Sequence, residues 1–530
     1  MTQGLRTPTG WGRPRVRKAW SWSAALAVSA SFAALAAPGP AVAQGETPRG
    51  YGEPAPKVRW HVCPEDWEVG PGWQCGTMTT PLDHAHPGRG TLELAVAKLP
   101  AKNPKKRIGS LLTNPGGPGV SGISLANRTG WEAKVNNAVK ERFDLVAYDP
   151  RGVAHSRPAL DCSQTTSGAQ QDEDDNLSPN PRNRREMIEQ LQDKDQSGAN
   201  CVKKAGRLVP YMSTVDNVRD LDKLRQALGD RKLSYYGISY GTTIGAVYAN
   251  LYPGRIRSLI LHGVVDVNTQ MKDTATYSIT DAMGQEYALN ARLAACDQDP
   301  DHCAFAGDAK AKFDRLADHL RNTHRSHPAP RQDWDSFVDL ARAFNGDARN
   351  KAEVRQAAQD LQDLYVEEFG SPQPSDRAAQ TSESNADDVL VATDCLDTPP
   401  LPEQTGPWLE WFREARAQAP IFGPAEVLRN KACRDWPDDF RAATPRYTGP
   451  WDRAQVPILL MNQEFDHSTP LNWARNMRDA MDQRGLVVID GFGHGIATPC
   501  SRSRSEDYLL HGRTPSGEAV CPDGDHTPFH

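Results

Sequence analysis

The residues Gly237-Ile238-Ser239-Tyr240-Gly241 constrain this chain more than any other segment. They match G-x-S-x-G, the sharp turn between a strand and a helix that raises a serine hydroxyl above the edge of a sheet. The preceding run 233–236 favours a buried strand, and the small, apolar run 242–249 favours a tightly packed helix. Glycines beside the serine are expected because the turn is strained and leaves no room for side chains. The flanking strand and helix argue against a chance match in a chain with 42 glycines.

A serine at such a turn works with an acid and a histidine that follow it along the chain in that order. The apolar run 456–461 predicts a strand, and Asp466 follows it at the sheet edge where open α/β sheets carry active sites. A second predicted strand, 486–489, leads to His494 in a glycine-rich loop. One histidine after one strand is usually an ordinary loop residue, but its place in this order favours a general base. We therefore predict Ser239, Asp466 and His494 as the catalytic residues, with Glu464 as the alternative acid.

A fourth part of such a site is a pair of backbone N–H groups that bind the oxyanion. The run 108–113 predicts a strand, and the glycine-dense loop 114–122 follows it. A loop of this kind is ordinarily a turn, but in this type of site it supplies one N–H group, while the residue after the serine supplies the other. Such a donor lowers the transition-state free energy by about 3–4 kcal/mol. The expected donors are Tyr240 and Gly117, with Gly116 next.

Five motifs taken together resemble those of a known family. They lie in order within residues 58–500, at 114–119, 149–152, 237–241, 466–470 and 493–495. Their order and composition are similar to the α/β-hydrolases of the proline iminopeptidase and tripeptidyl aminopeptidase group, and especially to the secreted actinobacterial tripeptidyl aminopeptidases. The resemblance implies an α/β-hydrolase fold with a mostly parallel sheet and an inserted helical cap. It also implies a serine exopeptidase that releases short peptides, here expected to be tripeptides, from free N-termini.

The chain departs from the family pattern at three positions. Asn114 stands where the iminopeptidases carry histidine, which favours the tripeptidyl branch. Ala154 replaces a usual glycine, and His262 replaces a usual aspartate. None of the three belongs to the predicted triad, so they bear on specificity more than on chemistry.

Two other functions stay open from the sequence. A secreted esterase or lipase would use the same triad, but its cap would present apolar surface to an acyl chain. A non-catalytic binding protein on this fold would need a broken triad, and every member is present here. The predicted chemistry needs no cofactor.

The first 43 residues differ from the remainder and predict a signal peptide. A basic start precedes a small apolar stretch, and Ala41-Val42-Ala43 offers a cleavage site before Gln44. The apolar stretch is too short to span a bilayer core of about 30 Å, so no stable membrane anchor is expected. The whole chain has a net charge of −6, and removing a basic leader makes the remainder more acidic. We expect a secreted, extracellular monomer without nucleic-acid partners.

Ten cysteines in an exported chain predict five disulfides rather than metal ligands. Connectivity does not follow from sequence alone, but pairing of neighbours would brace loops, including the hydrophilic segment 163–200, which resembles a solvated loop. No metal site is expected. The expected pairs are Cys63–Cys75, Cys162–Cys201, Cys296–Cys303, Cys395–Cys433 and Cys500–Cys521.

Periodicity divides the remaining chain into three parts. Residues 44–267 alternate strands and helices as the first part of the hydrolase core, and 446–530 return to the sheet with a disulfide-tied C-terminal tail. Between them, 268–445 look helical and predict a cap inserted between Ser239 and Asp466. Within it, Asp394 and Asp397 flank a cysteine and are candidates to bind a substrate ammonium, although two solvated acids would look the same.

Overall fold

A computed structural model describes residues 56–127, 130–162, 177–193, 197–322, 330–347, 349–370, 385–437 and 446–530. The predicted signal peptide 1–43 and its cleavage site lie outside the described residues. No helix within the described ranges combines the length and apolar character needed to cross a membrane.

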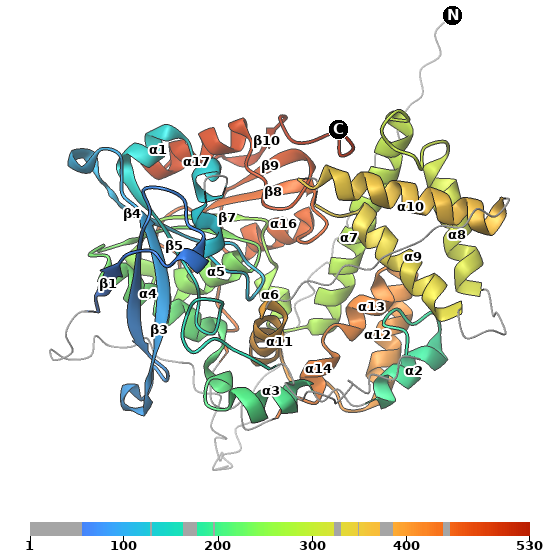
Figure 1. Ribbon diagram of the computed structural model, residues 1–530, viewed down its shortest axis with the longest axis horizontal. Helices are drawn as coiled ribbons and strands as arrows, with labels where there is room; N and C mark the ends of the chain where they lie inside the picture. Colours follow the sequence, from blue (N-terminus) through green and yellow to red (C-terminus); the bar gives the residue numbers. More distant parts are fainter. Residues whose placement is uncertain are drawn as a thin grey trace, which may run out of the picture. The chain divides into compact units, whose positions relative to one another are not determined.

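The described strands form one ten-stranded sheet, in the order β1-β2-β3-β5-β4-β6-β7-β8-β9-β10 (Figure 1). The pairs β1·β2, β2·β3 and β3·β5 are antiparallel, and every pair from β5 to β10 is parallel. This arrangement confirms the predicted α/β class with a mostly parallel sheet. The strands are β1 (Val58–His61), β2 (Gln74–Pro81), β3 (Thr91–Leu99), β4 (Gly109–Asn114), β5 (Phe143–Tyr148), β6 (Leu233–Ile238), β7 (Ile256–His262), β8 (Leu459–Phe465), β9 (Gly485–Phe492) and β10 (Gly517–Cys521).

Helices cover both faces of the sheet. Successive strand residues point to opposite faces, so Leu111 and Leu112 of β4 enter two different apolar clusters. The Leu112 cluster includes side chains of α4, α5 and α16, and the Leu111 cluster includes those of α1 and α17. These helices are α1 (Asn137–Arg142), α4 (Thr214–Ala227), α5 (Tyr240–Leu251), α16 (Leu471–Ala480) and α17 (Pro499–His511).

Between β7 and β8 the described chain is helical, and we call this region, from α6 to α14, the helical insertion. It has an apolar core of its own, in which Phe313, Phe337 and Phe344 are buried. Its helices are α6 (Val267–Gln270), α7 (Thr274–Gln298), α8 (Ala309–Asn322), α9 (Pro330–Phe344), α10 (Lys351–Phe369), α11 (Ala386–Asp397), α12 (Thr405–Gln418), α13 (Gly423–Leu428) and α14 (Lys431–Arg434).

Part of the segment expected to be a solvated loop is packed against this insertion. Residues 184–192 form α2 (Arg184–Gln192), which contacts α12 and buries Met187. The next helix, α3 (Ser197–Ala205), contacts α11 and α14. The indole of Trp334 donates a hydrogen bond to the carbonyl oxygen of Asn180 at 2.8 Å. The solvated-loop prediction was therefore wrong for 177–193, because a few apolar side chains in a polar segment suffice to dock it.

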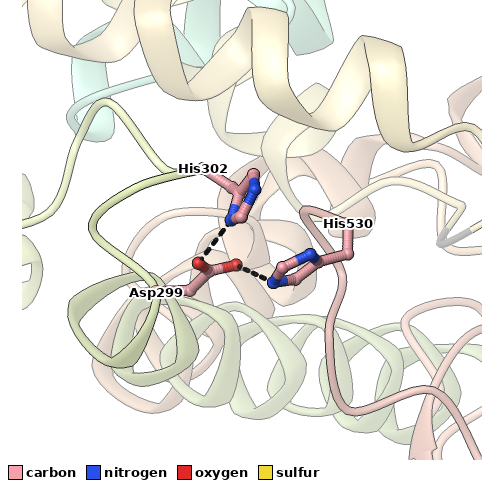
Figure 2. Close-up of side chains that lie close together, drawn as sticks. All are labelled: Asp299, His302 and His530. Atoms are coloured by element: carbon pink, nitrogen blue, oxygen red, sulfur yellow. Dashed lines mark hydrogen bonds and ion pairs between the residues drawn. The ribbon is translucent and has the colours of Figure 1, made fainter.

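All five predicted disulfides form, and no described cysteine is free. The bond Cys500–Cys521 ties β10 to α17, and Cys395–Cys433 ties α11 to α14. The loop closed by Cys296–Cys303 carries Asp299 and His302, which lie beside His530 (Figure 2).

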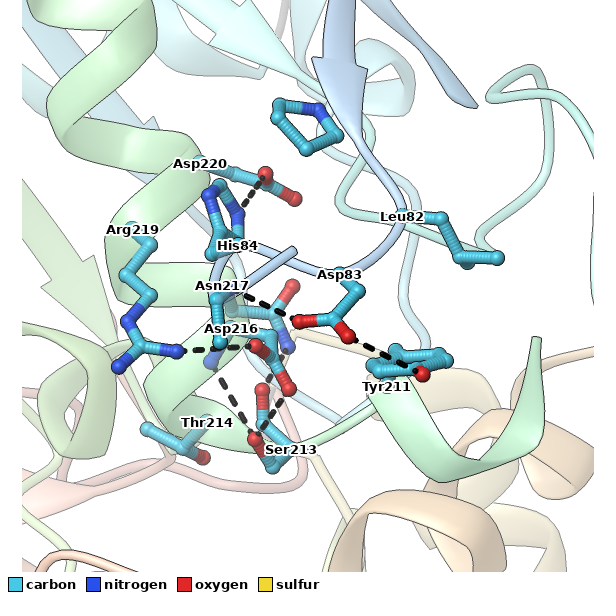
Figure 3. A network of polar contacts seen from close by, with 12 residues as sticks. Leu82, Asp83, His84, Tyr211, Ser213, Thr214, Asp216, Asn217, Arg219 and Asp220 are labelled. Carbon is cyan, nitrogen blue, oxygen red and sulfur yellow. Dashed lines mark hydrogen bonds and ion pairs between the residues drawn. The ribbon is translucent and has the colours of Figure 1, made fainter. Parts of the chain in front are cut away.

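A buried polar network fixes the loop that follows β5. Arg151, fully buried, donates to both carboxylate oxygens of Asp220 on α4 at 2.7 and 2.8 Å, and to the carbonyl oxygen of Leu82. Asp220 also bonds His84, and near it Asp216 accepts a hydrogen bond from Ser213 (Figure 3). The Arg151 charge, together with His84, holds the pKa of Asp220 below its usual range although burial raises it. The motif 149–152 thus joins the sheet to α4.

Candidate active site

Ser239 lies at the turn between β6 and α5, with φ 55° and ψ −128°. That conformation is rare for a residue with a side chain, and close packing enforces it. A Cβ added to Gly237 would lie 2.3 Å from the carbonyl oxygen of Gly241. A Cβ added to Gly116 would lie 2.6 Å from the Cβ of Ser239. The glycines therefore allow the turn to form, and the serine hydroxyl faces a cavity.

Asp466 and His494 meet across the loops that follow β8 and β9. The ring Nδ1 of His494 lies 3.0 Å from each carboxylate oxygen of Asp466. Asp466 is buried and also accepts hydrogen bonds from the Ser468 and Thr469 amides, both at 2.9 Å. Burial raises its pKa, but His494 and these donors outweigh that effect and hold the pKa below the ordinary value. An ionised carboxylate that orients an imidazole is what a general base requires.

Ser239 and His494 line the same cavity, which has a volume of about 610 Å³. The His494 ring packs over Gly263, where a Cβ would lie 2.9 Å from the ring, and Gly495 packs on Ile238, next to the serine. The structure thus brings the three predicted catalytic residues together. The alternative acid, Glu464, makes no described contact with His494 and instead interacts with Asp490.

Of the predicted oxyanion donors, Tyr240 and Gly117 line this cavity, whereas Gly116 is absent from the described lining. Among the described residues, neither the Gly117 nor the Tyr240 backbone N–H is used in a hydrogen bond. Gly117 has φ 100°, which glycine adopts readily. The Gly116 amide instead donates to Asn114 Oδ1 at 2.9 Å, so Gly117 is favoured over Gly116.

Three acids of the helical insertion line the cavity around one arginine. Asp281 of α7, Asp394 of α11 and Glu426 of α13 surround Arg429, which lies 3.2 Å from Asp281 and 3.6 Å from Glu426. Burial raises the pKa of Asp394 to about 6, against the opposing effect of Arg429. Burial and repulsion by Glu426 raise the pKa of Asp281 well above its ordinary value. Arg429 thus faces three acids, whereas the other two arginines of the insertion that line the cavity, Arg342 and Arg349, pair with Asp339 and Asp347. A further cation bound beside the three acids would favour the charged forms of Asp281 and Asp394.

Two of these acids have atoms without a hydrogen bond. Asp281 Oδ1 and Glu426 Oε2 are buried and find no such partner among the described residues. Sequence reasoning missed both residues, because they lie on helices far apart in the chain and nothing local marks them.

Asp397 does not belong to this group. It is absent from the described cavity lining, and its carboxylate accepts hydrogen bonds from the Thr214 amide and hydroxyl. Asp394 and Asp397 lie three residues apart on α11, and only Asp394 faces the cavity. Asp397, predicted from the sequence to bind a substrate ammonium, therefore lies outside the group of acids that faces the cavity.

A second interaction that the sequence did not predict supports the His494 loop. His262, buried at the end of β7, lies 2.8 Å from the Tyr236 hydroxyl and 3.2 Å from Gln463 Oε1. Burial lowers the pKa of His262 to about 3, so the ring is neutral and Nε2 donates to the glutamine oxygen. Gln463 in turn donates to the Ile496 carbonyl at 2.6 Å. The departure at His262 was visible in the sequence, but its partner Gln463 was not.

Lys134 also holds the loop that carries His494. Its Nζ donates to the Gly495 carbonyl oxygen at 2.7 Å, and its side chain lines the cavity. Burial lowers the pKa of Lys134 to about 8.

A mostly parallel α/β sheet with a serine at the strand–helix turn and an aspartate-held histidine beside it defines a serine hydrolase. The family described as alpha/beta hydrolase fold matches residues 109–497. The chain belongs to this family.

Curated relatives match over most of the chain. The tripeptidyl aminopeptidase of Streptomyces lividans is 29% identical over 487 residues, covering 88% of this chain and 86% of the relative. Serine protease Hip1 of Mycobacterium tuberculosis is 30% identical over 501 residues, covering 88% of this chain and 91% of the relative. Carboxylesterase B of M. tuberculosis is 28% identical over 503 residues, covering 90% of this chain and 92% of the relative. These relatives include both peptidases and an esterase.

Proposed function

We propose that this chain is a secreted serine exopeptidase that removes short peptides from free N-termini. Tripeptides are the expected product, after the activity named for the Streptomyces relatives. The observation that carries the proposal is the group of three acids around Arg429 in the cavity that Ser239 and His494 line.

The proposed reaction is acyl transfer through the serine. His494 Nε2 takes the proton of the Ser239 hydroxyl, whose oxygen attacks the scissile carbonyl carbon. Asp466 holds the Nδ1 proton and stabilises the imidazolium, while the Gly117 and Tyr240 amides bind the oxyanion. The imidazolium then gives its proton to the leaving amine, and water hydrolyses the acyl-enzyme by the same route.

The acids supply what a free N-terminus requires. An ammonium group entering a cavity loses hydration and needs anions and hydrogen-bond acceptors in exchange. Asp281, Asp394 and Glu426 offer both, because two of their oxygens make no hydrogen bond within the described ranges of the chain. Arg429 holds Asp281 and Glu426 by ion pairs. An ammonium bound beside the acids would favour the charged forms of Asp281 and Asp394, which burial disfavours. A substrate with an acetylated N-terminus would leave these oxygens unpaired.

The main alternative is a secreted esterase, as the name of one relative indicates. An acyl chain favours an apolar pocket. The part of the cavity formed by the insertion instead carries the acids Asp281, Asp394 and Glu426 and the arginines Arg342, Arg349 and Arg429. This charge favours a peptide over a lipid or a simple ester.

The test is a panel of chromogenic substrates of one to four residues, each with a free or an acetylated N-terminus, beside a short-chain ester. We expect preferential cleavage of free-amine peptides, with three residues preferred. Asp281→Asn, Asp394→Asn and Glu426→Gln should each raise KM for free-amine peptides about tenfold, equivalent to about 1.4 kcal/mol. Hydrolysis of the ester should barely change.

Asp397→Asn is the matched control, because Asp397 lies on the same helix as Asp394 but outside the cavity lining. It should leave the ratio of free-amine to ester hydrolysis unchanged. Equal cleavage of free and acetylated peptides by the wild-type enzyme would reject the exopeptidase proposal and favour an esterase or endopeptidase.

Export is supported by the five disulfides, since such bonds persist in oxidising compartments. The predicted signal peptide is consistent with this location.

A further inference from the structure

Two histidines and an aspartate meet outside the cavity, where the last residues of the chain contact the helical insertion (Figure 2). His302 Nδ1 lies 2.8 Å from Asp299 Oδ1, and His530 Nε2 lies 3.2 Å from Asp299 Oδ2. The centres of the two imidazole rings are 3.8 Å apart. One ligand atom from each residue lies within 4.8 Å of the others. Both imidazole rings therefore face the Asp299 carboxylate, and the three ligand atoms lie close enough together to bind one ion.

The chain holds Asp299 and His302 in a short, closed loop. The disulfide Cys296–Cys303 joins the two ends of this loop. Inside it, the Asp299 carbonyl oxygen accepts hydrogen bonds from the His302 and Cys303 amides at 3.2 and 3.0 Å. Two of the three ligands are thus fixed by the backbone before any ion binds, which lowers the entropic cost of binding.

The third residue, His530, is positioned by the residue before it. Phe529 is fully buried and packs near Phe344 in the core of the insertion. Its carbonyl oxygen accepts a hydrogen bond from Arg355 at 3.0 Å, and Lys351 donates to the Thr527 carbonyl at 3.0 Å. The C-terminal residues are docked on α10, and His530 is therefore not a freely moving end.

The contacts within the cluster leave it incompletely satisfied. Asp299 Oδ2 is buried and makes no hydrogen bond among the described residues, although the His530 ring is near it. Two imidazoles and one carboxylate suit Zn²⁺ and similar ions, which bind such donors at about 2.0–2.2 Å in tetrahedral geometry with water as a fourth ligand. Ca²⁺ and Mg²⁺ favour oxygen donors and fit poorly. We propose that Asp299, His302 and His530 bind a divalent transition-metal ion of the zinc class, which cross-links the C-terminal residues to the insertion.

The test uses the full mature protein, first stripped of metal by a chelator and then dialysed against ZnCl₂. We expect one equivalent of bound Zn²⁺ with a Kd of about 10 μM or below, and Co²⁺ should give the intense visible bands of a tetrahedral site. His302→Ala, His530→Ala and Asp299→Asn should each weaken binding at least tenfold. The matched control is His511→Ala, an exposed histidine at the end of α17.

A second readout separates metal binding from simple ion pairing. Saturating Zn²⁺ should raise the thermal midpoint of the wild-type protein by about 2 °C and leave that of His302→Ala unchanged. Peptide hydrolysis by the three variants should match wild type, since none of these residues lines the cavity. The proposal would be overturned if the wild-type protein bound no Zn²⁺ at about 100 μM ZnCl₂. Binding that His302→Ala and His530→Ala leave unaltered would also overturn it, because the ion would then be held elsewhere.

Discussion

Single residues at the strand–helix turn explain why the sequence was so informative there. The φ of 55° at Ser239 is tolerated because Gly116, Gly237 and Gly241 leave space around it. Ala154, by contrast, has φ 37° at a position where the related family usually has glycine. A methyl group is the smallest side chain that the left-handed region accommodates at modest cost. The same rule therefore explains both the glycines of the motif in this chain and one departure from the family pattern.

The three residues at the turn and sheet edge carry a direct prediction. Ser239→Ala, Asp466→Asn and His494→Ala should each lower kcat by about 10⁴-fold or more, because they act as one unit in proton transfer and attack. Steady-state hydrolysis of a free-amine peptide measures the loss, and circular dichroism checks that the variants fold. Ser503→Ala, an exposed serine on α17, is the control. Wild-type activity in Ser239→Ala would show that the nucleophile lies elsewhere.

At the scale of helices and strands, the positions of individual elements could be predicted from the sequence. The packing that brings several helices of the insertion together at the cavity could not. The predicted strand 233–236 lies within β6, and the predicted helix 242–249 lies within α5. These runs have a clear apolar period or a buried β-prone composition. The acidic group is different: α11 was singled out from sequence, whereas Asp281 and Glu426 converge on Asp394 only through the packing of α7 and α13. Local patterns contain no information on such contacts.

Asp397 on helix α11 leads to a prediction about how the free energy of unfolding depends on pH. Burial raises the pKa of Asp397 to about 7, against the opposing hydrogen bonds from Thr214, whereas an unfolded chain protonates aspartate near pH 4. Between about pH 4 and pH 7 the folded state therefore binds more protons than the unfolded state. Because of this difference, the free energy of unfolding falls as pH rises through the window.

Asp397→Asn keeps an oxygen for Thr214 and removes the ionisable group. Relative to wild type, this variant should become more stable as pH rises from 4 to 8, by on the order of 2–4 kcal/mol. Thermal or denaturant unfolding at several pH values measures the difference. Asp318→Asn, whose carboxylate is 77% exposed, should show no such trend. If the difference in unfolding free energy between Asp397→Asn and wild type stayed constant with pH, the raised pKa of Asp397 would be contradicted.

At the scale of the whole molecule, the pairing of the cysteines leads to a prediction about the compartment in which the protein folds. The five bonds brace the first strands, the junction of α3 with the loop after β5, two places in the insertion, and the last strand. We predict that the exported protein begins near Gln44 and contains no free thiol, because an oxidising compartment allows every cysteine to pair. Mass spectrometry of the secreted protein, alkylated without reduction, measures both features at once. A reduced and alkylated sample is the control and should gain ten modifications, one for each cysteine. Two or more alkylated cysteines without reduction would refute full pairing, and a mature start far from residue 44 would refute the predicted cleavage site.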